Sequence, residues 1–290
     1  MMRVVVTGAQ GQMGAAMVRE CAGRHEVVAL DRAGLDVFDE TAVLAVMTRE
    51  RPDAVVNCTG YNAVDAAEDH PTEALAANAL AVRALARAAT EVGAALVHFS
   101  SDFVFDGSGS TPMTEADPPN PRSVYATSKL LGEWLALDSP QSYVLRVESL
   151  FGEVPGAAPK GSVAGIVQAL RAGLVPKVFQ DRTVSPTYVF DAARATRELL
   201  ERRHPPGLYH CVNTGQATWL EFATEAARLL GAQPRFDVVR FADVKLPAAR
   251  PQYCALSNRK LTSLEGVEMP TWQDALARYV QSRLSLSPKP

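Results

Sequence analysis

The amino-acid sequence predicts an α/β fold, in which a doubly wound parallel sheet is joined to a smaller, interleaved C-terminal lobe. Short runs rich in strand-forming residues alternate with longer, Ala-rich amphipathic stretches, which is the pattern of β-α-β units. A glycine-rich segment at residues 8–14 separates the first run from the first amphipathic stretch. At 290 residues the chain is long enough for about two domains and a core that folds unaided.

The first half of the chain alternates predicted strands with predicted helices. The strands span residues 4–7, 26–30, 54–58 and 95–100, and the helices span residues 12–21, 41–49 and 72–92. The last of these helices has the clearest ends, because Pro71 and Glu73 suit a first turn and Gly93 suits a C-terminal stop. Asn78 lies on the buried stripe of that helix.

The amino-acid composition changes after residue 147. Residues 143–147 are a predicted strand, which follows a predicted helix that begins near Tyr125. Pro and Gly residues crowd between Gly152 and Gly161, and we expect a domain boundary there. The later predicted elements are helices at 163–172 and 186–200 and a strand at 208–212, while residues 219–230 and a loop at 247–251 look like a smaller appended lobe. The first domain thus comprises residues 1–152, to which 184–213 and a C-terminal helix near 270–284 return, and the lobe comprises 153–183 and 214–269.

Composition and charge exclude several classes of protein. With 29 Lys and Arg against 32 Asp and Glu, the net charge of -3 offers no positive field to a polyphosphate backbone, so we expect no nucleic-acid partner. The sequence has neither a membrane-length apolar stretch nor the pattern of a secretory signal, so we expect a cytoplasmic protein without membrane contact. Its cysteines and histidines form no CxxC or HExxH motif, and we expect neither disulfides nor a metal site.

The glycine-rich segment has the chemistry of a pyrophosphate-binding turn. It reads Gly8-Ala9-Gln10-Gly11-Gln12-Met13-Gly14 and lies between a predicted strand and a predicted helix. Glycines here permit a tight turn and a close approach of the main chain to a pyrophosphate, and a helix N-terminus favours negative charge. Asp31 follows the next predicted strand, where a carboxylate can accept hydrogen bonds from ribose hydroxyls, and Arg32 can reach a 2′-phosphate. The pattern predicts a Rossmann-type site for NADPH or NADH; an ordinary glycine turn is the alternative.

Tyr125 and Lys129 lie four positions apart and therefore share one face of a predicted helix. A free phenol, with a pKa near ~10, is a poor proton shuttle at neutral pH, but a cation within a few Å stabilises the phenolate and lowers that pKa. The pair therefore predicts a general acid. The Tyr-x-x-x-Lys spacing also arises by chance. It becomes strong evidence for a catalytic pair only in combination with the glycine-rich segment.

Other candidates follow predicted strands, at the sheet edge where ligands bind. Ser101 can donate a hydrogen bond to a substrate carbonyl oxygen as hydride arrives; capping is the alternative, and the one we favour for Ser100. Residues 58–61 follow another strand. Asn78 is equally consistent with a buried amide satisfied by main chain and with support of the site.

Together these residues resemble the extended short-chain dehydrogenase/reductase family and, within it, the dTDP-4-dehydrorhamnose reductase branch. The resemblance spans nearly the whole chain. Beyond the glycine-rich segment and the Tyr/Lys pair, it rests on Arg51-Pro52-Asp53, Val55-Val56-Asn57, Ala63-Val64-Asp65, Glu68, residues 100–107, Gly132-Glu133, residues 207–210, Thr218-Trp219, Arg250-Pro251 and Leu256.

The resemblance implies roles for individual residues. Tyr125 is the implied proton donor, Lys129 lowers its pKa and anchors the nicotinamide ribose, and Ser101 takes a position where the family usually has Thr. The full set expected at the cofactor is Gly8, Gln10, Gly11, Gln12, Met13, Gly14, Asp31, Arg32, Asp36, Val37, Cys58, Thr59, Gly60, Tyr61, Asn78, Tyr125 and Lys129. In that set Asp36 and Val37 would border the adenine. The residues implied to face a sugar nucleotide are Val64, Asp102, Val104 and Arg250.

Three segments depart from the reductase pattern, and all map to the substrate side. Arg146-Val147-Glu148-Ser149 replaces a stretch that resembles Arg-Thr-Ser-Trp, and Arg182-Thr183-Val184-Ser185 replaces a Gln-x-Gly-like segment. Cys254 stands where Ser is usual. The departures leave the identity of the sugar open.

We therefore expect an NAD(P)H-dependent oxidoreductase that reduces a keto group on a nucleotide-activated deoxysugar, with conversion of dTDP-4-dehydrorhamnose to dTDP-rhamnose as the first candidate reaction. A sugar-nucleotide epimerase or dehydratase is one alternative; the family's dehydratases carry Asp-Glu where Asp102 is followed by Phe103. A non-catalytic dinucleotide-binding regulatory subunit, similar to that of methionine adenosyltransferase, is another. Arg250 is the candidate cation for the diphosphate, with a structural salt bridge as its alternative. The sequence leaves open whether the chain forms a homodimer.

Overall fold

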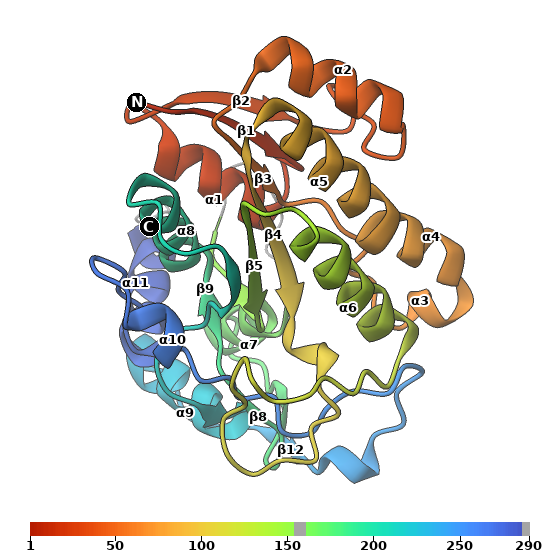
Figure 1. The fold of residues 1–290 in the computed structure, drawn as a ribbon. Helices are drawn as coiled ribbons and strands as arrows, with labels where there is room; N and C mark the ends of the chain where they lie inside the picture. Colours follow the sequence, from red (N-terminus) through yellow and green to blue (C-terminus); the bar gives the residue numbers. More distant parts are fainter. Residues whose placement is uncertain (154–160, 286–290) are drawn as a thin grey trace.

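The computed structural model describes residues 1–153 and 161–285, and it confirms the predicted fold class. In this part of the chain six parallel strands form one sheet in the order β10-β5-β4-β3-β1-β2 (Figure 1). In that order the strands span Gly207–His210, Ser142–Val147, Ala95–Ser101, Ala54–Asn57, Arg3–Thr7 and Glu26–Leu30. The two neighbours of β1 are β2 and β3, so the chain changes direction across the sheet at β1, which is where doubly wound sheets bind ligands.

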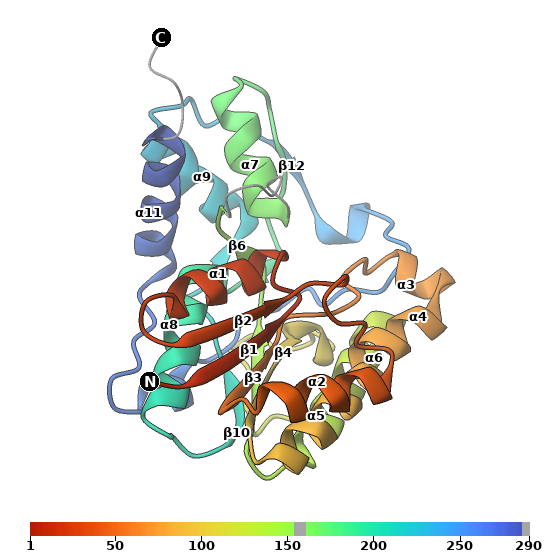
Figure 2. The same cartoon turned by 90° about the horizontal axis from the view of Figure 1, so that it is seen from above.

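Helices cover both faces of the sheet (Figure 2). One face carries α1 (Gln12–Cys21) and α8 (Val189–Glu201). The other face carries α2 (Glu40–Glu50), α5 (Ala81–Val92) and α6 (Val124–Leu137). The central strands are buried on both faces, which explains why β1 and β3 read as unbroken apolar runs.

The helix predicted at residues 72–92 is a chain of three elements. These are α4 (Pro71–Leu75), a π-helical turn η1 (Ala76–Leu80) and α5. The wider turn brings the main chain of Asn78 against α6, where a Cβ on Gly132 would lie 2.0 Å from the Asn78 main-chain oxygen. Only glycine fits there, so the sequence is adapted to this irregular turn, which periodicity alone did not reveal. A short helix α3 (Ala66–Asp69) precedes α4.

The smaller lobe lies at one end of the sheet, below it in Figure 1. Its own core is built by α7 (Gly161–Arg171), α9 (Trp219–Leu230) and α11 (Trp272–Ser285). Its short strand pairs are β6–β9 (Leu150–Phe151 with Thr187–Tyr188), β8–β11 (Thr183–Val184 with Ala217–Thr218) and β7–β12 (Lys177–Phe179 with Asp237–Val239). The remaining short elements are η2 (Asp102–Val104), η3 (Phe241–Asp243) and α10 (Arg259–Thr262).

The surroundings of α11 bear on the predicted domain organisation, which stays a prediction. The sequence assigned this helix to the first domain; in the structure Leu276 and Tyr279 are buried with Phe222, and the apolar side of α11 packs against α9. The helix also packs against β9, and Arg278 forms an ion pair with Asp191 of α8 at an N···O distance of 2.6 Å, both within the segment 184–213 that the sequence assigned to the first domain. The other predicted boundaries stay predictions, and the loop expected at residues 154–160 lies outside the described residues.

Four cysteines, all described, are free thiols: Cys21, Cys58, Cys211 and Cys254. None of the described helices combines the length and the apolar character that crossing a bilayer requires.

Candidate active site

The glycine-rich turn joins β1 to α1 and leaves no room for side chains. Gly8 has a φ of +66°, and a Cβ there would lie 2.9 Å from the main-chain carbon of Cys58. A Cβ on Gly14 would lie 2.2 Å from the main-chain oxygen of Gly8. Gly11 is the N-cap residue of α1, and no side chain caps this helix. The first amides of α1 are therefore left to an anionic ligand, as a pyrophosphate-binding turn requires.

A cavity of about 430 Å³ adjoins this turn. Eight predicted cofactor residues line it, namely Gly8, Asp31, Arg32, Asp36, Val37, Thr59, Gly60 and Tyr61. Four residues that were not predicted complete the lining, namely Leu35, Phe38, Glu73 and Ala77. Phe38 is 51% exposed, and its position directly after Asp36 and Val37, which the resemblance implies at the adenine, was a signal in the sequence that could have found it. The cavity and the uncapped helix together fit a dinucleotide.

Asp31 lies at this cavity with its carboxylate held by its own turn. Oδ1 accepts hydrogen bonds from the main-chain nitrogens of Ala33 and Gly34, both at 3.0 Å, and Oδ2 accepts one from Gln10 Nε2 at 2.5 Å. Arg32 is exposed. The acid is therefore fixed in place, whereas the neighbouring guanidinium can move toward a phosphate.

Three more residues predicted at the cofactor, Gln12, Met13 and Cys58, lie near the turn, but their side chains are outside the lining of the cavity. Met13 is buried in the core on the α1 side of the sheet. Gln12 Nε2 donates a hydrogen bond to the main-chain oxygen of Gly152 at 2.9 Å, which ties α1 to the strand that leads into the lobe. Cys58 presents its main chain to Gly8, and burial raises the pKa of its thiol above the usual range. None of these three side chains lines the cavity as described.

Asn78 holds the loop that forms one wall of the cavity. Its Oδ1 accepts a hydrogen bond from the Tyr61 nitrogen at 2.8 Å, and its Nδ2 donates to the Tyr61 oxygen at 3.0 Å and to Ser128 Oγ at 2.9 Å. Both predicted alternatives therefore describe it: the amide is satisfied by main chain, and that main chain belongs to the site.

A buried polar network beneath the same loop was missed by sequence reasoning. Asn57 Oδ1 accepts hydrogen bonds from Thr7 Oγ1 at 3.0 Å and from the Thr59 nitrogen at 3.0 Å. Asn57 Nδ2 lies 3.2 Å from His98 Nδ1. Burial, aided by the charge of Lys129, lowers the pKa of His98 well below its usual value, so this imidazole is neutral. The network fixes the ends of β1, β3 and β4 relative to one another.

Ser101, Tyr125 and Lys129 meet where β4 ends and α6 begins, and all three side chains are buried. The ring of Tyr125 packs edge-on against Phe103, with 5.5 Å between ring centroids. The ammonium of Lys129 lies 3.6 Å from the point that a Cβ on Gly60 would occupy, so it borders the loop that lines the cavity. The three predicted catalytic groups and the cofactor cavity are therefore adjacent.

The electrostatics of this group differ from the prediction. Burial raises the pKa of the Tyr125 phenol above its usual range; the charge of Asp102 adds to the effect and a hydrogen bond with Ser101 opposes it. Burial also lowers the pKa of Lys129 to about 8, against the charge of Glu133. The net shift is opposite to the lowered pKa that was predicted, and Lys129 is not among the groups that act on the pKa of the phenol in this structure.

Ser100 has a structural role one residue away. Its hydroxyl donates a hydrogen bond to Glu133 Oε1 at 2.6 Å, and Arg146 donates to both oxygens of that carboxylate, at 2.8 Å from Nε and 2.7 Å from Nη2. These buried contacts fasten α6 to β4 and β5. The capping role that the sequence favoured for Ser100 is therefore wrong, because its hydroxyl bonds to a carboxylate of α6 and caps none of the described helices.

The structure places the residues implied to face a sugar nucleotide in different surroundings. Val64 is half-buried and packs in the same small cluster as Tyr125 and Phe103, and its place beside a sugar nucleotide stays a prediction. Val104 is a correction: its side chain has no exposed surface and packs with Leu130 and Leu256, because η2 turns it into the core. It cannot face a substrate from there.

The structure shows the salt bridge that was one of the two alternatives predicted for Arg250. Its Nη2 forms an ion pair with Asp65 Oδ2 at 2.8 Å, and this contact lowers the pKa of Asp65. Its Nη1 is buried and has no hydrogen-bond partner among the described residues. The guanidinium is thus anchored on one side and keeps a donor for a ligand on the other.

The three segments that depart from the reductase pattern converge on Asp102. Oxygen atoms of Asp102 and Glu148 and the sulfur of Cys254 all lie within 4.8 Å of one another, and all three residues are buried. Arg182 Nη2 donates to Cys254 Sγ at 3.5 Å. Because the guanidinium already supplies positive charge beside both carboxyls, we assign no metal to this group. We call these four residues the charge cluster.

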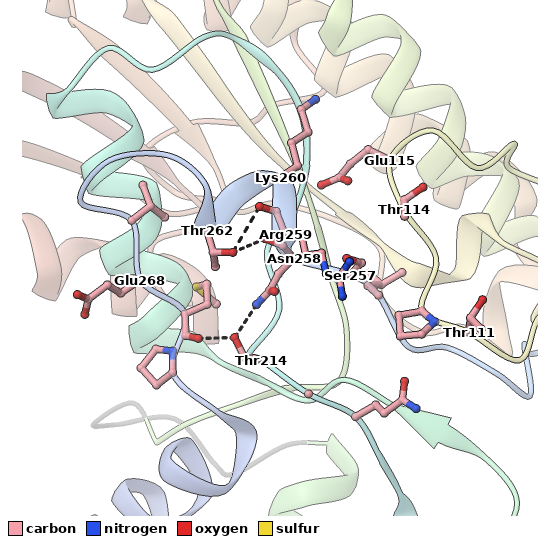
Figure 3. Close-up of a pocket in the computed structure, with 17 residues that line it drawn as sticks. Thr111, Thr114, Glu115, Thr214, Ser257, Asn258, Arg259, Lys260, Thr262 and Glu268 are labelled. Atoms are coloured by element: carbon pink, nitrogen blue, oxygen red, sulfur yellow. Dashed lines mark hydrogen bonds between the residues drawn. The ribbon is translucent and has the colours of Figure 1, made fainter.

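A larger cavity, of about 1120 Å³, lies elsewhere (Figure 3). Its polar groups largely bond to one another and to main chain: Asn258 Nδ2 donates to Thr214 Oγ1 at 3.0 Å, and Thr214 Oγ1 donates to the Met269 oxygen at 2.6 Å. None of its described lining residues was predicted for the site. This cavity has the larger volume, but the smaller cavity is lined by predicted cofactor residues and adjoins the uncapped N-terminus of α1. We therefore place the candidate site at the smaller cavity.

Comparisons with known proteins identify the family of this chain. The model of the RmlD substrate binding domain family matches residues 2–285. A dTDP-4-dehydrorhamnose reductase of Streptomyces griseus is 36% identical over 282 residues, covering 94% of this chain and 91% of that protein. A solved dTDP-4-dehydrorhamnose reductase from Clostridium acetobutylicum has a TM-score of 0.92 at 31% identity, covering 98% of this chain and 100% of that one. Another, from Bacillus anthracis in complex with NADP, has a TM-score of 0.90 at 28% identity, covering 97% and 99%. The chain therefore belongs to the RmlD substrate binding domain family.

Proposed function

We propose that the chain is an NAD(P)H-dependent oxidoreductase that reduces the keto group of a nucleotide-activated deoxysugar, with dTDP-4-dehydrorhamnose as the first candidate. One observation carries the proposal: Ser101, Tyr125 and Lys129 are buried together beside the cavity that the glycine-rich turn adjoins. One relative is named dTDP-4-dehydrorhamnose reductase, and a solved reductase of that name is a complex with NADP; both observations support the proposal.

The cofactor would be held by the main chain of the glycine-rich turn, by Asp31 and by the loop at residues 59–61, which fits either NADPH or NADH. When bound, it supplies a hydride to the keto carbon. Lys129, whose ammonium borders Gly60, is placed to bind the ribose beside the nicotinamide.

Tyr125 is the proton donor in this proposal. The phenol is protonated at neutral pH, and it can give its proton to the oxygen that gains charge as the keto group is reduced, because the alkoxide formed there is a stronger base than the phenolate. Ser101 can hold the same oxygen by donating its own hydroxyl proton. That proton is directed at Asp102 Oδ1 here, at 2.9 Å, so the hydroxyl must turn toward the substrate when it binds.

Arg250 is the proposed ligand of the diphosphate, because its free Nη1 can donate to a phosphate oxygen while Asp65 keeps the side chain in place. Val64 and Asp102 would border the sugar. A homodimer and a cytoplasmic location stay predictions.

The proposal is tested by measuring NADPH and NADH oxidation with a panel of dTDP-, UDP- and GDP-linked 4-keto-6-deoxysugars. We expect turnover with at least one of them and loss of turnover in Tyr125→Phe. Oxidation with none of the panel, by protein that binds the dinucleotide, favours the regulatory-subunit alternative. Tightly bound NAD in the purified protein, together with interconversion of sugar stereoisomers, favours the epimerase alternative.

A further inference from the structure

Two members of the charge cluster, Arg182 and Cys254, bond to the same main-chain oxygen. Arg182 Nε donates a hydrogen bond to the Pro251 oxygen at 3.1 Å, and the Cys254 thiol donates to that oxygen at 3.3 Å. Arg182 Nη2 also donates to Cys254 Sγ at 3.5 Å. Pro251 directly follows Arg250, so these contacts hold the main chain beside the proposed ligand of the diphosphate.

The chain after Pro251 is also paired with the start of β8. The Cys254 nitrogen donates to the Thr183 oxygen at 2.8 Å, and the Thr183 nitrogen donates to the Gln252 oxygen at 3.1 Å. On its other side Pro251 meets Gly107, where a Cβ would lie 2.5 Å from the Pro251 Cβ. Pro251 is buried, and the close contact leaves it little room to shift toward Gly107.

Arg250 is therefore held on both sides in the chain. Before it, the Ala248 nitrogen donates to Asp65 Oδ1 at 3.1 Å, and Arg250 Nη2 pairs with Oδ2 of the same carboxylate at 2.8 Å. After it, Arg182 binds the Pro251 oxygen from the lobe. These two contacts together decide where the free Nη1 of Arg250 lies.

Arg182 is well suited to hold this oxygen. It begins the segment that replaces a Gln-x-Gly-like segment of the reductase pattern, and Cys254 stands where Ser is usual. A guanidinium makes a stronger, charge-assisted hydrogen bond than a neutral amide, and its planar fork can reach two acceptors at once. A thiol is a weak donor, so Arg182 is the stronger of the two donors to the Pro251 oxygen. Both departures thus act on the position of Pro251.

Arg182 also reaches the ring beside the proton donor. Its guanidinium carbon lies 5.8 Å from the centroid of the Phe103 ring, and that ring packs edge-on against Tyr125. The side chain can therefore act on the substrate through Arg250 or on Tyr125 through Phe103. The hydrogen bond to the Pro251 oxygen is direct and charge-assisted, whereas the ring contact is close to the distance at which a cation and a ring cease to attract. The route through Arg250 is therefore the stronger one.

We propose that Arg182 is a positioning residue for substrate binding, which holds the chain at Pro251 and thereby places Arg250 Nη1 where a diphosphate oxygen binds. The inference rests on the proposed function, in which Arg250 is the ligand of the diphosphate. Arg182 takes no part in proton or hydride transfer, so its loss should weaken binding and leave the chemical step nearly unchanged. The effect also needs Arg250, because without that guanidinium there is no donor to position.

The test is a double-mutant cycle that combines Arg182→Gln with Arg250→Ala in the whole protein. KM and kcat are measured with a sugar nucleotide that the enzyme accepts, and calorimetry gives the dissociation constant of dTDP without any turnover. We expect Arg182→Gln to raise KM and the dissociation constant about fivefold or more and to keep kcat within about twofold. In the Arg250→Ala protein, the same substitution should change the dissociation constant less than about twofold.

Two further variants complete the comparison. Arg182→Lys keeps a cation that can reach one acceptor, and it should raise both constants about two- to threefold; it also serves as the test if Arg182→Gln does not fold. Arg228→Gln is the matched control, because it removes an exposed guanidinium of α9, paired with Glu225 at 2.6 Å, and should change neither constant. The melting temperature of every variant shows that it is folded.

Unchanged KM and dissociation constant in both Arg182 variants would overturn the inference. A fall in kcat at constant KM would also overturn it, because Arg182 would then act on Tyr125 through Phe103. An equal rise of the dissociation constant with and without the Arg250 guanidinium would show that Arg182 binds the diphosphate by itself, which contradicts a positioning role. If the unsubstituted protein neither binds dTDP nor oxidises NADPH with any sugar of the panel, the proposed function itself is contradicted, and the inference falls with it.

Discussion

Lys129 Nζ donates a hydrogen bond to the main-chain oxygen of Phe99, at a distance of 2.8 Å. The contact crosses from α6 to β4 and holds the ammonium against the sheet edge where the proposed reaction takes place. Burial of the ammonium lowers the free energy of unfolding, because the charged amine loses its water and has a main-chain oxygen as its hydrogen-bond partner instead. The lysine therefore bears on stability as well as on the site.

Lys129→Met should show this effect as a pH-dependent difference in stability. The pKa of Lys129 is lowered from 10.5 in the unfolded chain to about 8 in the folded one, so between these values the unfolded chain binds the extra proton. The stability of the unsubstituted protein relative to Lys129→Met should then rise by about 1.4 kcal/mol per pH unit from pH 8 to 10.5 and be flat below pH 7. Urea unfolding of both proteins at several pH values checks this; parallel curves throughout would mean that the lysine is not desolvated.

Tyr125→Phe should keep dinucleotide binding and lose turnover. The substitution removes the phenolic hydroxyl but keeps the ring that packs against Phe103. We expect kcat to fall by roughly 10²-fold or more, with the dissociation constant for NADPH changed less than about threefold. Steady-state kinetics and fluorescence titration measure the two quantities. Near-normal kcat in a folded variant would remove Tyr125 from the role of proton donor.

Arg250→Ala should raise KM for the sugar nucleotide by about tenfold or more, with a smaller effect on kcat, because a diphosphate loses a guanidinium donor. Asp65→Asn is the matched comparison, since it breaks the same ion pair but keeps the guanidinium. If the ion pair is only structural, both variants lower the melting temperature alike and neither changes KM.

Asp31→Ala and Arg32→Ala should change the cofactor preference in opposite directions. The carboxylate of Asp31 repels a 2′-phosphate, so its loss favours NADPH; the exposed Arg32 attracts that phosphate, so its loss favours NADH. We expect the unsubstituted enzyme to use both cofactors within about tenfold in kcat/KM. The ratio of kcat/KM for NADH and NADPH is measured in each variant, with Arg24→Ala as an exposed control. A ratio that stays constant in both would show that neither side chain reaches the ribose.

Local pattern accounts for most of what could be predicted. The helix 12–21 and the strand 26–30 were predicted with the bounds that the structure has, because each carries its own periodicity and end signals. The turn at Gly8 and the pair of Tyr125 and Lys129 were found for the same reason, since each motif lies within one short segment.

What could not be predicted depends on contacts between distant segments. Glu148, Arg182 and Cys254 were each noticed as departures, but only the tertiary fold brings them within reach of Asp102. The apolar side of α11 indicated burial without indicating that α9 and β9 are its partners. The pKa of Tyr125 depends on how much water the fold excludes, which no spacing in the sequence expresses.

The transfer of deuterium from NADPH labelled at C4 of the nicotinamide tests the central claim most directly. With a 4-keto-6-deoxysugar nucleotide that the enzyme accepts, mass spectrometry and NMR of the product should show one deuterium on the carbon that carried the keto group, and Tyr125→Phe should form this product at a rate lower by roughly 10²-fold or more. A product without deuterium at that carbon, or a sugar that is epimerised while the labelled NADPH remains unoxidised, would contradict the account.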